Sequence, residues 1–268
     1  MIQISDSKTI ILEDESYEIE INSDKAIDLT FVIQNNTNVL VNIQSCPSLH
    51  ISCELKEDYE AKILYWNSSK NELVTSEEYN VYRNGDLTVA YGECNLANTN
   101  RDTTILLKEA GANAVLSSAS LVNVNKEYRM RVVNEAEHTH GDMKNYAVVL
   151  SEGKLMIDAI GAIKKGAHRA ESHQTSRALS FAEGQKATIL PELLIDENDV
   201  QASHAMSMGR MDEDQLYYMM SRGLSIEDCT SLIATGYLLP IVDVVKDENL
   251  KETLKKELEG KIQELCSM

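Results

Sequence analysis

The chain has 268 residues, 43% of them hydrophobic, with only two Phe and one Trp, so it can bury a large core of aliphatic side chains. Its formal net charge of −18 argues against nucleic acid or an anionic membrane surface as a partner, because both would repel it. The sequence has no apolar stretch of membrane-spanning length and no signal-peptide pattern at its first residues, so we expect a cytoplasmic protein.

Residues 1 to about 200 are predicted to form a succession of short strands. Tyr17–Ile21 alternates polar and apolar residues, as a half-buried strand does. Similar runs, separated by turn residues, occur at Leu29–Ile33, Asn38–Ile43, Leu49–Leu55, Ala61–Tyr65, Leu87–Tyr91, Thr103–Leu107, Ala114–Val122, Tyr128–Val133, Tyr146–Leu150 and Leu155–Ile160.

The turns between these runs favour a particular architecture. No glycine precedes Gly85, so the early turns depend on Asn and Asp, which tolerate left-handed backbone geometry. Hairpin signals are scarce, and Asn84-Gly85-Asp86 is the main one. Many strands with few tight hairpins fit a parallel β-helix at least as well as a meander, and a β-sandwich remains the structural alternative.

After about residue 210 the pattern becomes helical. Acidic residues after Met211 suit the first turn of a helix that ends near Gly223 and carries Leu216, Met219 and Met220 on its apolar face. Ser225-Ile226-Glu227-Asp228 resembles a capping signal for a second helix, which Pro240 closes.

A third helix is predicted from Asp247, with a narrow apolar stripe between Lys and Glu residues. Such a stripe can dock on its own protein, or it can bind a partner, and the sequence leaves both interpretations open. The stripe consists of Leu250, Leu254, Leu258, Ile262 and Leu265.

The five cysteines are odd in number and widely spaced, without a CxxC pair, so they indicate neither a disulfide framework nor a zinc site. Buried free thiols are the expected state, whereas a protein that held an iron–sulfur cluster alone would show clustered thiolates. The cysteines are Cys46, Cys53, Cys94, Cys229 and Cys266.

The common catalytic motifs are absent: the sequence has no GxGxxG, P-loop, HExxH or GxSxG. His138 and His140 would share one face of a strand, which could suit a metal, but a solvated strand end is the favoured interpretation. His168 and His173 lie in a polar run that is expected to be a solvated turn. His204 lies between a strand-like stretch and the first helix, where functional side chains are often displayed.

Several motifs of the C-terminal half occur in a recognisable order across residues 140–240. They resemble the SufB/SufD family of iron–sulfur cluster assembly scaffolds, and its SufD-like branch in particular. The motifs are Gly161–Ala167, Gln174–Ser180, Pro191–Ile195, Ser203–Arg210 and Asp212–Leu224.

The resemblance implies a mainly β protein, a right-handed parallel β-helix followed by a small C-terminal α-helical region. The β-helix core domain would span residues 1–210, and the ATPase-docking helical region residues 211–268. Larger relatives carry an additional N-terminal helical region. Because this sequence starts directly in strands, we expect a short form without it.

The resemblance also implies partners. Family members pair through the end of the β-helix, here with a SufB-type subunit or with a second copy of the chain. Their C-terminal helices bind the ATPase subunit SufC, which would place Tyr217, Tyr218, Leu232 and Tyr237 near that partner. SufC would hydrolyse ATP, and this chain is expected to transmit the movement without being an enzyme.

His204 matches a family histidine proposed to help hold a nascent cluster at the subunit interface, and a neutral imidazole can ligate iron. Ala202 and Ala205 stand where SufD-like relatives often have Cys and Gly, and no thiol occurs near Gln185, where SufB-type relatives have cysteine. We therefore expect no tightly bound cofactor, but a transient cluster whose thiolates come from the partner.

Two other functions remain open. A β-helical carbohydrate-active enzyme, either a lyase or a hydrolase, predicts an acid-lined groove midway along the solenoid. The scarcity of aromatic residues and the net charge of −18 speak against it. The missing cysteines also fit a structural subunit that has lost contact with the cluster and only stabilises its partner.

Overall fold

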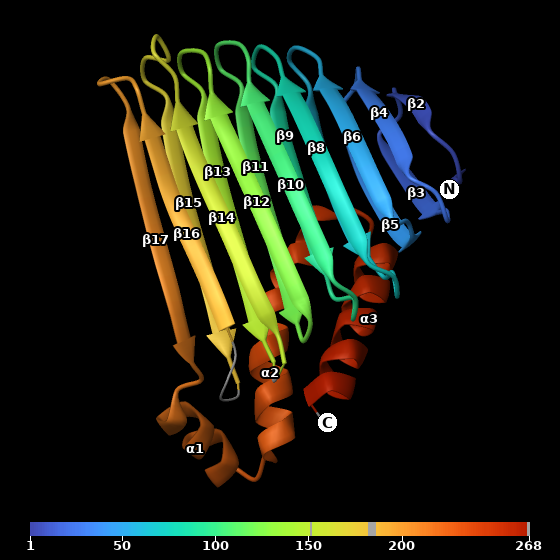
Figure 1. Cartoon of the computed structure of the whole chain (residues 1–268), viewed down its shortest axis with the longest axis vertical. Coiled ribbons are helices and arrows are strands. Elements are labelled where there is room, and N and C mark those ends of the chain that lie inside the picture. Colours follow the sequence, from blue (N-terminus) through green and yellow to red (C-terminus); the bar gives the residue numbers. More distant parts are fainter. Residues whose placement is uncertain (151, 182–185, 267–268) are drawn as a thin grey trace.

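The computed structural model describes residues 1–150, 152–181 and 186–266, and these form a parallel β-helix with helices packed along one side (Figure 1). Successive strands alternate between two sheets, and each strand pairs in parallel with the strand two places away in the chain. The nine-stranded sheet contains β1 (Ile2–Ile4), β3 (Ser16–Asn22), β5 (Thr37–Ser45), β7 (Glu60–Asn67), β9 (Asp86–Glu93), β11 (Asn113–Val122), β13 (His140–Val149), β15 (Glu171–Ser180) and β17 (Gln201–Arg210). The eight-stranded sheet contains β2 (Lys8–Leu12), β4 (Ile27–Ile33), β6 (Ser48–Leu55), β8 (Leu73–Val81), β10 (Thr99–Leu107), β12 (Asn125–Asn134), β14 (Lys154–Ile163) and β16 (Lys186–Ile195).

The coils lengthen along the chain. Ile2 lies opposite Ile19, a separation of 17 residues, whereas Lys154 lies opposite Lys186, a separation of 32 residues. The strands lengthen as well, from three residues in β1 to ten in β17. A repeat of changing length gives no fixed period in the sequence.

The predicted parallel β-helix with C-terminal helices is confirmed, and the β-sandwich alternative is wrong. Every strand named from the sequence lies largely or wholly within an observed one. The expected solvated turn around His173 is wrong, because this residue lies within β15. Its strand was missed because the inward-facing residues Ser172, Gln174 and Ser176 are polar, although all three are buried.

One corner of the solenoid is built from stacked left-handed residues, along the top of Figure 1. They recur at equivalent positions in successive coils from Asp58 to Arg169, and each donates its N–H to the next coil. His138 N–H, for example, donates to His168 O at 2.9 Å. Asn84 is one of them, so Asn84-Gly85-Asp86 turns the chain between sheets and forms no hairpin. The expectation that Asn and Asp adopt left-handed geometry in the turns is confirmed at Asp58 and Asn84. The residues are Asp58, Asn84, Gly111, His138 and Arg169.

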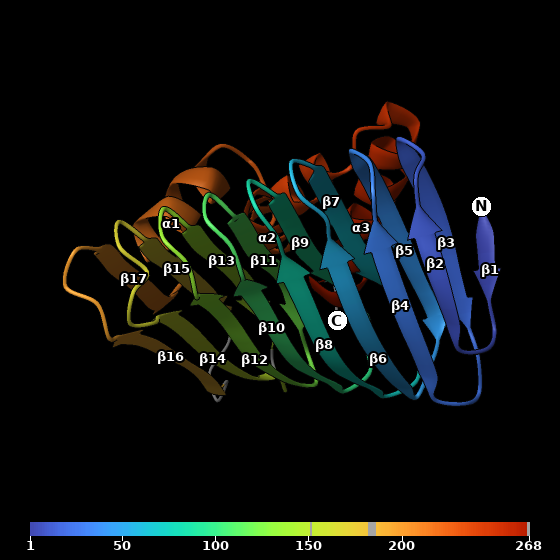
Figure 2. The same ribbon diagram turned by 90° about the horizontal axis from the view of Figure 1, so that it is seen from above.

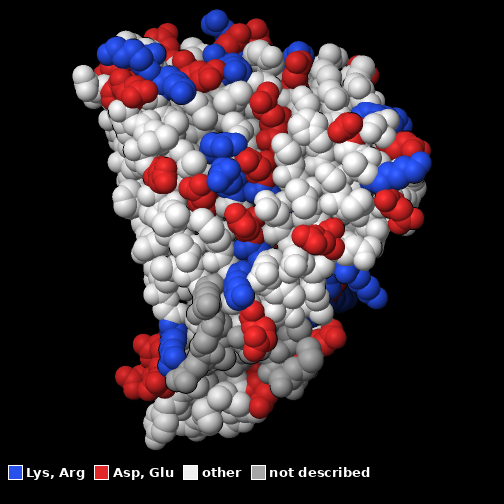
Figure 3. Space-filling view, in the orientation of Figure 1, with Lys and Arg blue, Asp and Glu red and all other residues white. Residues whose placement is uncertain are grey.

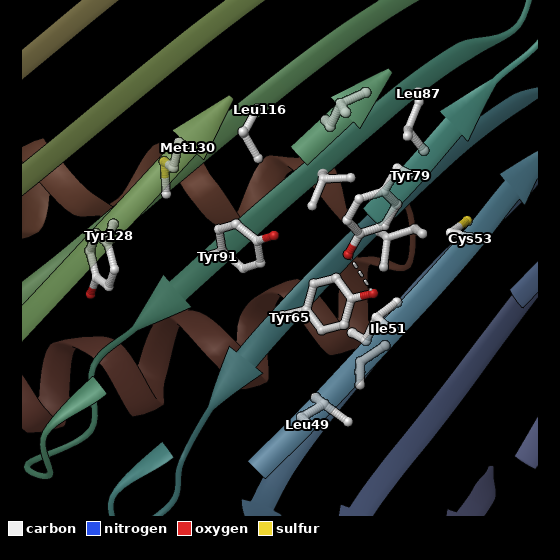
Figure 4. Packing of buried hydrophobic residues seen from close by; sticks show 14 of the residues in the cluster. Leu49, Ile51, Cys53, Tyr65, Tyr79, Leu87, Tyr91, Leu116, Tyr128 and Met130 are labelled. Carbon is white, nitrogen blue, oxygen red and sulfur yellow. Dashed lines mark hydrogen bonds between the residues drawn. The ribbon is translucent and has the colours of Figure 1, made fainter. Parts of the chain in front are cut away.

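The space between the sheets is filled by stacked aliphatic side chains, with four tyrosines near the middle of the solenoid (Figure 4). The Tyr79 hydroxyl lies 2.9 Å from the Tyr65 hydroxyl and 2.9 Å from Glu77 Oε2. Burial raises the pKa of both hydroxyls well above the ordinary value, so both stay protonated and available as donors.

A fully buried ionic network adjoins these tyrosines. Arg101 Nη1 lies 2.6 Å from Glu77 Oε1, and Arg101 Nε lies 2.6 Å from Glu93 Oε1. Lys126 Nζ donates to Glu93 O and to Asn95 Oδ1 at 3.1 and 2.5 Å. Burial lowers the pKa of Lys126 to about 8, although Glu93 opposes the shift. Two cations therefore face two carboxylates in a region without solvent.

We expect Arg101→Met to lower the free energy of unfolding by about 3–5 kcal/mol, because it leaves buried carboxylates without their cation. The charge-balanced variant Arg101→Met/Glu77→Gln keeps the Glu93–Lys126 pair and should recover a large part of that loss. Urea unfolding followed by circular dichroism measures both values. A loss below about 1 kcal/mol for the single variant would contradict the importance of the network.

The C-terminal segment consists of α1 (Glu213–Ser221), α2 (Ile226–Leu238), the short 3-10 helix η1 (Leu239–Val244) and α3 (Glu248–Cys266). The capping signal expected for the second helix is confirmed, because Ser225 and Asp228 form a capping box on α2. The acidic first turn expected for the first helix is also confirmed, with Glu213 and Asp214 there, and the Asp212 side chain caps α1. Gly223, with φ +93°, follows α1. No helix among the described residues is long and apolar enough to cross a membrane.

Helices α2 and α3 and the segment η1 cover the outer face of the nine-stranded sheet (Figure 2). The predicted stripe of α3 packs there, with Leu254, Leu258 and Ile262 buried against the sheet, so it docks on its own protein. The side chain of Leu265 lies outside the described part of the chain. Glu257 accepts hydrogen bonds from Trp66 Nε1 at 3.0 Å and Ser68 Oγ at 2.9 Å, which fixes α3 against β7.

Candidate functional site

The candidate site is the open end of the solenoid formed by the last strand of each sheet. Within the described ranges, β16 pairs only with β14, and β17 pairs only with β15. Each last strand has ten residues, and all ten residues of β17 are exposed. Both strands therefore present one edge whose backbone groups could continue the ladder.

His204 belongs to the inner face of this end. Met143, Gln174 and His204 lie opposite one another on β13, β15 and β17. Met143 and Gln174 are buried between the sheets. In parallel strands that pair in register, side chains at opposite positions point to the same side of the sheet. The side of β17 that carries His204 is therefore the inner one. His204 was expected between a strand-like stretch and the first helix, whereas it is the fourth residue of β17.

His204 lies beside the polar Gln174 of β15 and shares the open end with exposed apolar residues. Met206 and Met208 share its face by alternation and are 46% and 44% exposed. Ile195, on the inner face of β16, is 37% exposed, and Leu190 and Leu194 are exposed on the same strand. In Figure 3, charged residues lie near the two ends of β16 and β17. The surface between these ends is largely free of charge. This end thus combines free strand edges with an apolar face.

Two groups hold the end in place. Gln174 Nε2 donates to Glu192 O at 2.8 Å and ties β15 to β16 across the interior. In the turn before β17, Glu197 accepts hydrogen bonds from the N–H groups of Gly166 at 3.0 Å and Asn198 at 2.8 Å. These bonds lower the pKa of Glu197 to about 2, so its carboxylate stays charged and anchors the turn.

The described thiols do not belong to the strands of this end. Cys46, Cys53, Cys94 and Cys229 are all buried, and none lies on β16 or β17. Burial raises the pKa of Cys94 to about 12, so its thiol is a poor metal ligand. Ala202 lies on the same side of β17 as His204, and Gln185 lies outside the described residues.

The four residues predicted to bind a partner do not form one surface. Tyr217 and Tyr218 on α1 are 76% and 58% exposed, and Leu232 on α2 is 55% exposed. Tyr237 is half-buried and packs edge-on against Tyr146 of β13, with ring centroids 6.4 Å apart. The first three are free to meet a partner, whereas Tyr237 mainly holds α2 on the sheet.

A groove of about 400 Å³ lies between the nine-stranded sheet and the segment from α2 to η1. Tyr146, Tyr237 and Ile241 line it together with Lys144 and Arg177, and no carboxylate is among its lining residues. It does not match the acid-lined groove that a carbohydrate-active enzyme would need midway along the solenoid.

The fold and the open end define a parallel β-helix protein with a helical segment packed on one face and a strand-edge surface at the end of both sheets. Residues 21–237 match the family described as SUF system FeS cluster assembly, SufBD core domain. The chain therefore belongs to the SufB/SufD family of iron–sulfur cluster assembly proteins, and the predicted family is confirmed.

Individual relatives agree with this family. The chain is 34% identical over 137 residues to the iron–sulfur cluster assembly protein SufD of Bacillus subtilis, which covers 51% of this chain and 31% of that protein. It is 25% identical over 105 residues to SufD of Escherichia coli, covering 39% and 25% of the two chains. A SufBD family protein of Staphylococcus aureus is 22% identical over 202 residues, covering 74% and 43%. The chain thus spans less than half of each relative's length.

Proposed function

We propose that this chain is a non-catalytic scaffold subunit in SUF iron–sulfur cluster assembly, pairing with a SufB-type subunit through the open end of its β-helix. The observation that carries the proposal is the open end itself, with two ten-residue strand edges beside exposed Met206 and Met208. Unpaired edges next to apolar surface are a hazard for a protein alone and an efficient docking surface for a partner that continues both sheets.

The donor set favours a SufB-type partner over a second copy of this chain. Two copies would bring two imidazoles of His204 to the interface, but no thiolate from β16 or β17. Nascent iron–sulfur clusters are held chiefly by thiolates. In the proposal the partner provides these thiolates, and His204 adds one nitrogen ligand to a transient cluster, which is cargo of the complex.

The pairing surface can be tested with Met206→Glu, which places a carboxylate on the apolar inner face. We expect it to weaken the complex with a SufB-type subunit by at least about tenfold, because the carboxylate would be desolvated on pairing. Val74→Glu on the outer face of β8 is the matched control, since Val74 is 44% exposed and β8 is separated from β16 by β14, β12 and β10. Size-exclusion chromatography with light scattering measures the complex. Equal affinities of the two variants would refute the surface, and retained self-pairing without SufB-type binding would refute the choice of partner.

The ligand role of His204 has its own test. We expect His204→Ala to lower the iron and sulfide bound by the anaerobically reconstituted complex, without changing the thermal stability of the subunit, because His204 is exposed and contributes no packing. His50→Ala, an exposed histidine on β6, serves as the control. Equal iron and sulfide yields from the two variants would remove His204 from the site.

The proposal also gives α1 and the exposed side of α2 a role in binding a SufC-type ATPase. Helix α1 has no buried residue, and it presents Tyr217, Tyr218 and Met220 beyond the lower end of the sheet in Figure 1. A helix that exposes two tyrosines and only partly buries Leu216 and Met219 against its own protein is suited to a partner. ATP hydrolysis would occur on the partner, and this chain would transmit the movement.

We expect Tyr217→Ala/Tyr218→Ala to weaken binding to the ATPase subunit by about tenfold or more, as removal of interface aromatics usually does. Leu96→Ala, at a 44% exposed position in the turn before β10, is the control. Tyr237→Ala should lower the melting temperature instead. Deleting residues 211–268 is a poorer test, since it would uncover Trp66 and Leu121 on the sheet. Unchanged binding by the double variant would exclude α1 as the docking element.

A further inference from the structure

Two histidines and a glutamate gather on the outer face of the nine-stranded sheet, on the opposite side of that sheet from His204. His140 begins β13, and Glu171 and His173 are the first and third residues of β15. His140 lies directly opposite Glu171, and His173 lies two residues further along the same face. The helices cover the sheet nearer Val148 and Leu150, so these three side chains stay 32% to 41% exposed.

Two of the three pairs of donor atoms have the spacing of ligands on one metal ion. His140 Nδ1 lies 3.3 Å from Glu171 Oε2, and His173 Nε2 lies 3.4 Å from the same oxygen. All three donors lie within 4.8 Å of one another. Two ligands bound at about 2.0–2.2 Å to one ion are roughly 3.0–3.5 Å apart, so both measured pairs already meet this requirement.

A neighbouring hydroxyl orients one of the imidazoles. His173 Nδ1 lies 2.7 Å from Ser203 Oγ on β17. When Nδ1–H donates to that oxygen, Nε2 keeps its lone pair and faces Glu171, which is the arrangement of a metal-ligating histidine with a second hydrogen bond. Asp142, on the same face, pairs with Lys144 at 2.6 Å, so this lysine is held away from Glu171.

We propose that His140, Glu171 and His173 form a binding site for a divalent transition metal ion, with water completing the coordination. Two imidazoles and one carboxylate suit Zn²⁺ and Fe²⁺ and disfavour Ca²⁺ and Mg²⁺, which prefer oxygen ligands. The pair His138 and His140 considered from the sequence does not form, because His138 occupies the left-handed corner before β13. The ligands come instead from two adjacent strands whose backbones the ladder holds rigid.

The test is titration of Zn²⁺ into the full-length chain, stripped of metal and without partner subunits, followed by isothermal titration calorimetry. We expect one site whose affinity falls by at least about tenfold in Glu171→Gln and about a hundredfold in His140→Ala/His173→Ala. Zn²⁺ should also raise the melting temperature of the wild-type chain and not that of the double variant, which reports on the folded state directly.

His138→Ala and His204→Ala are the controls, one in the adjacent corner and one on the other face of the sheet. Both should keep the affinity of this site. Equal Zn²⁺ affinity in the wild type and the double variant, or loss of binding on His204→Ala alone, would overturn the proposal. Because no partner subunit or cluster takes part, these results are independent of the pairing and cluster experiments.

Discussion

The parallel backbone ladder is the constraint on which the rest of this structure depends. The backbone groups at the edges of each strand find hydrogen-bond partners only in the strands one coil earlier and one coil later. Every coil therefore stabilises its neighbours, and the last described coil leaves two strand edges open. The position of His204 follows from this rule, because β17 repeats the inward and outward alternation of β15 without a further strand to cover it. The helices cover the face of the nine-stranded sheet and leave its last edge open.

The interior shows a second consequence of stacking. A solenoid core is long and thin, and here it holds the Arg101 network with both carboxylates and both cations buried. Such a network is costly to desolvate and can be satisfied in only one register. Because a slip of one residue would turn Arg101 toward solvent and separate it from Glu77 and Glu93, the network can select the correct register of β10 on β8, with β9 facing them from the other sheet.

The sequence predicted the fold where inward side chains are aliphatic, as in Tyr17–Ile21, and it predicted the helices from caps such as Ser225. The prediction was wrong where the inward-facing side chains are polar, so His173 was assigned to a turn although it lies in β15. The stripe of α3 could not be assigned a partner surface, because Trp66 and Leu121, which it covers, lie on strands buried on both faces. The cluster of His140 and Glu171 depends on a 31-residue coil, and the length of a coil cannot be read from a sequence without a fixed repeat.

The lengthening of the coils also determines which assemblies can form. A solenoid with matching ends can stack head to tail without limit and grow into a fibre. Here the strands at one end have three and five residues, whereas those at the other have ten, so the narrow end cannot satisfy the edges of the wide one. Head-to-tail contact between two copies of the described coils would therefore leave at least half of each ten-residue edge without backbone partners. The taper of these coils thus disfavours stacking of this kind.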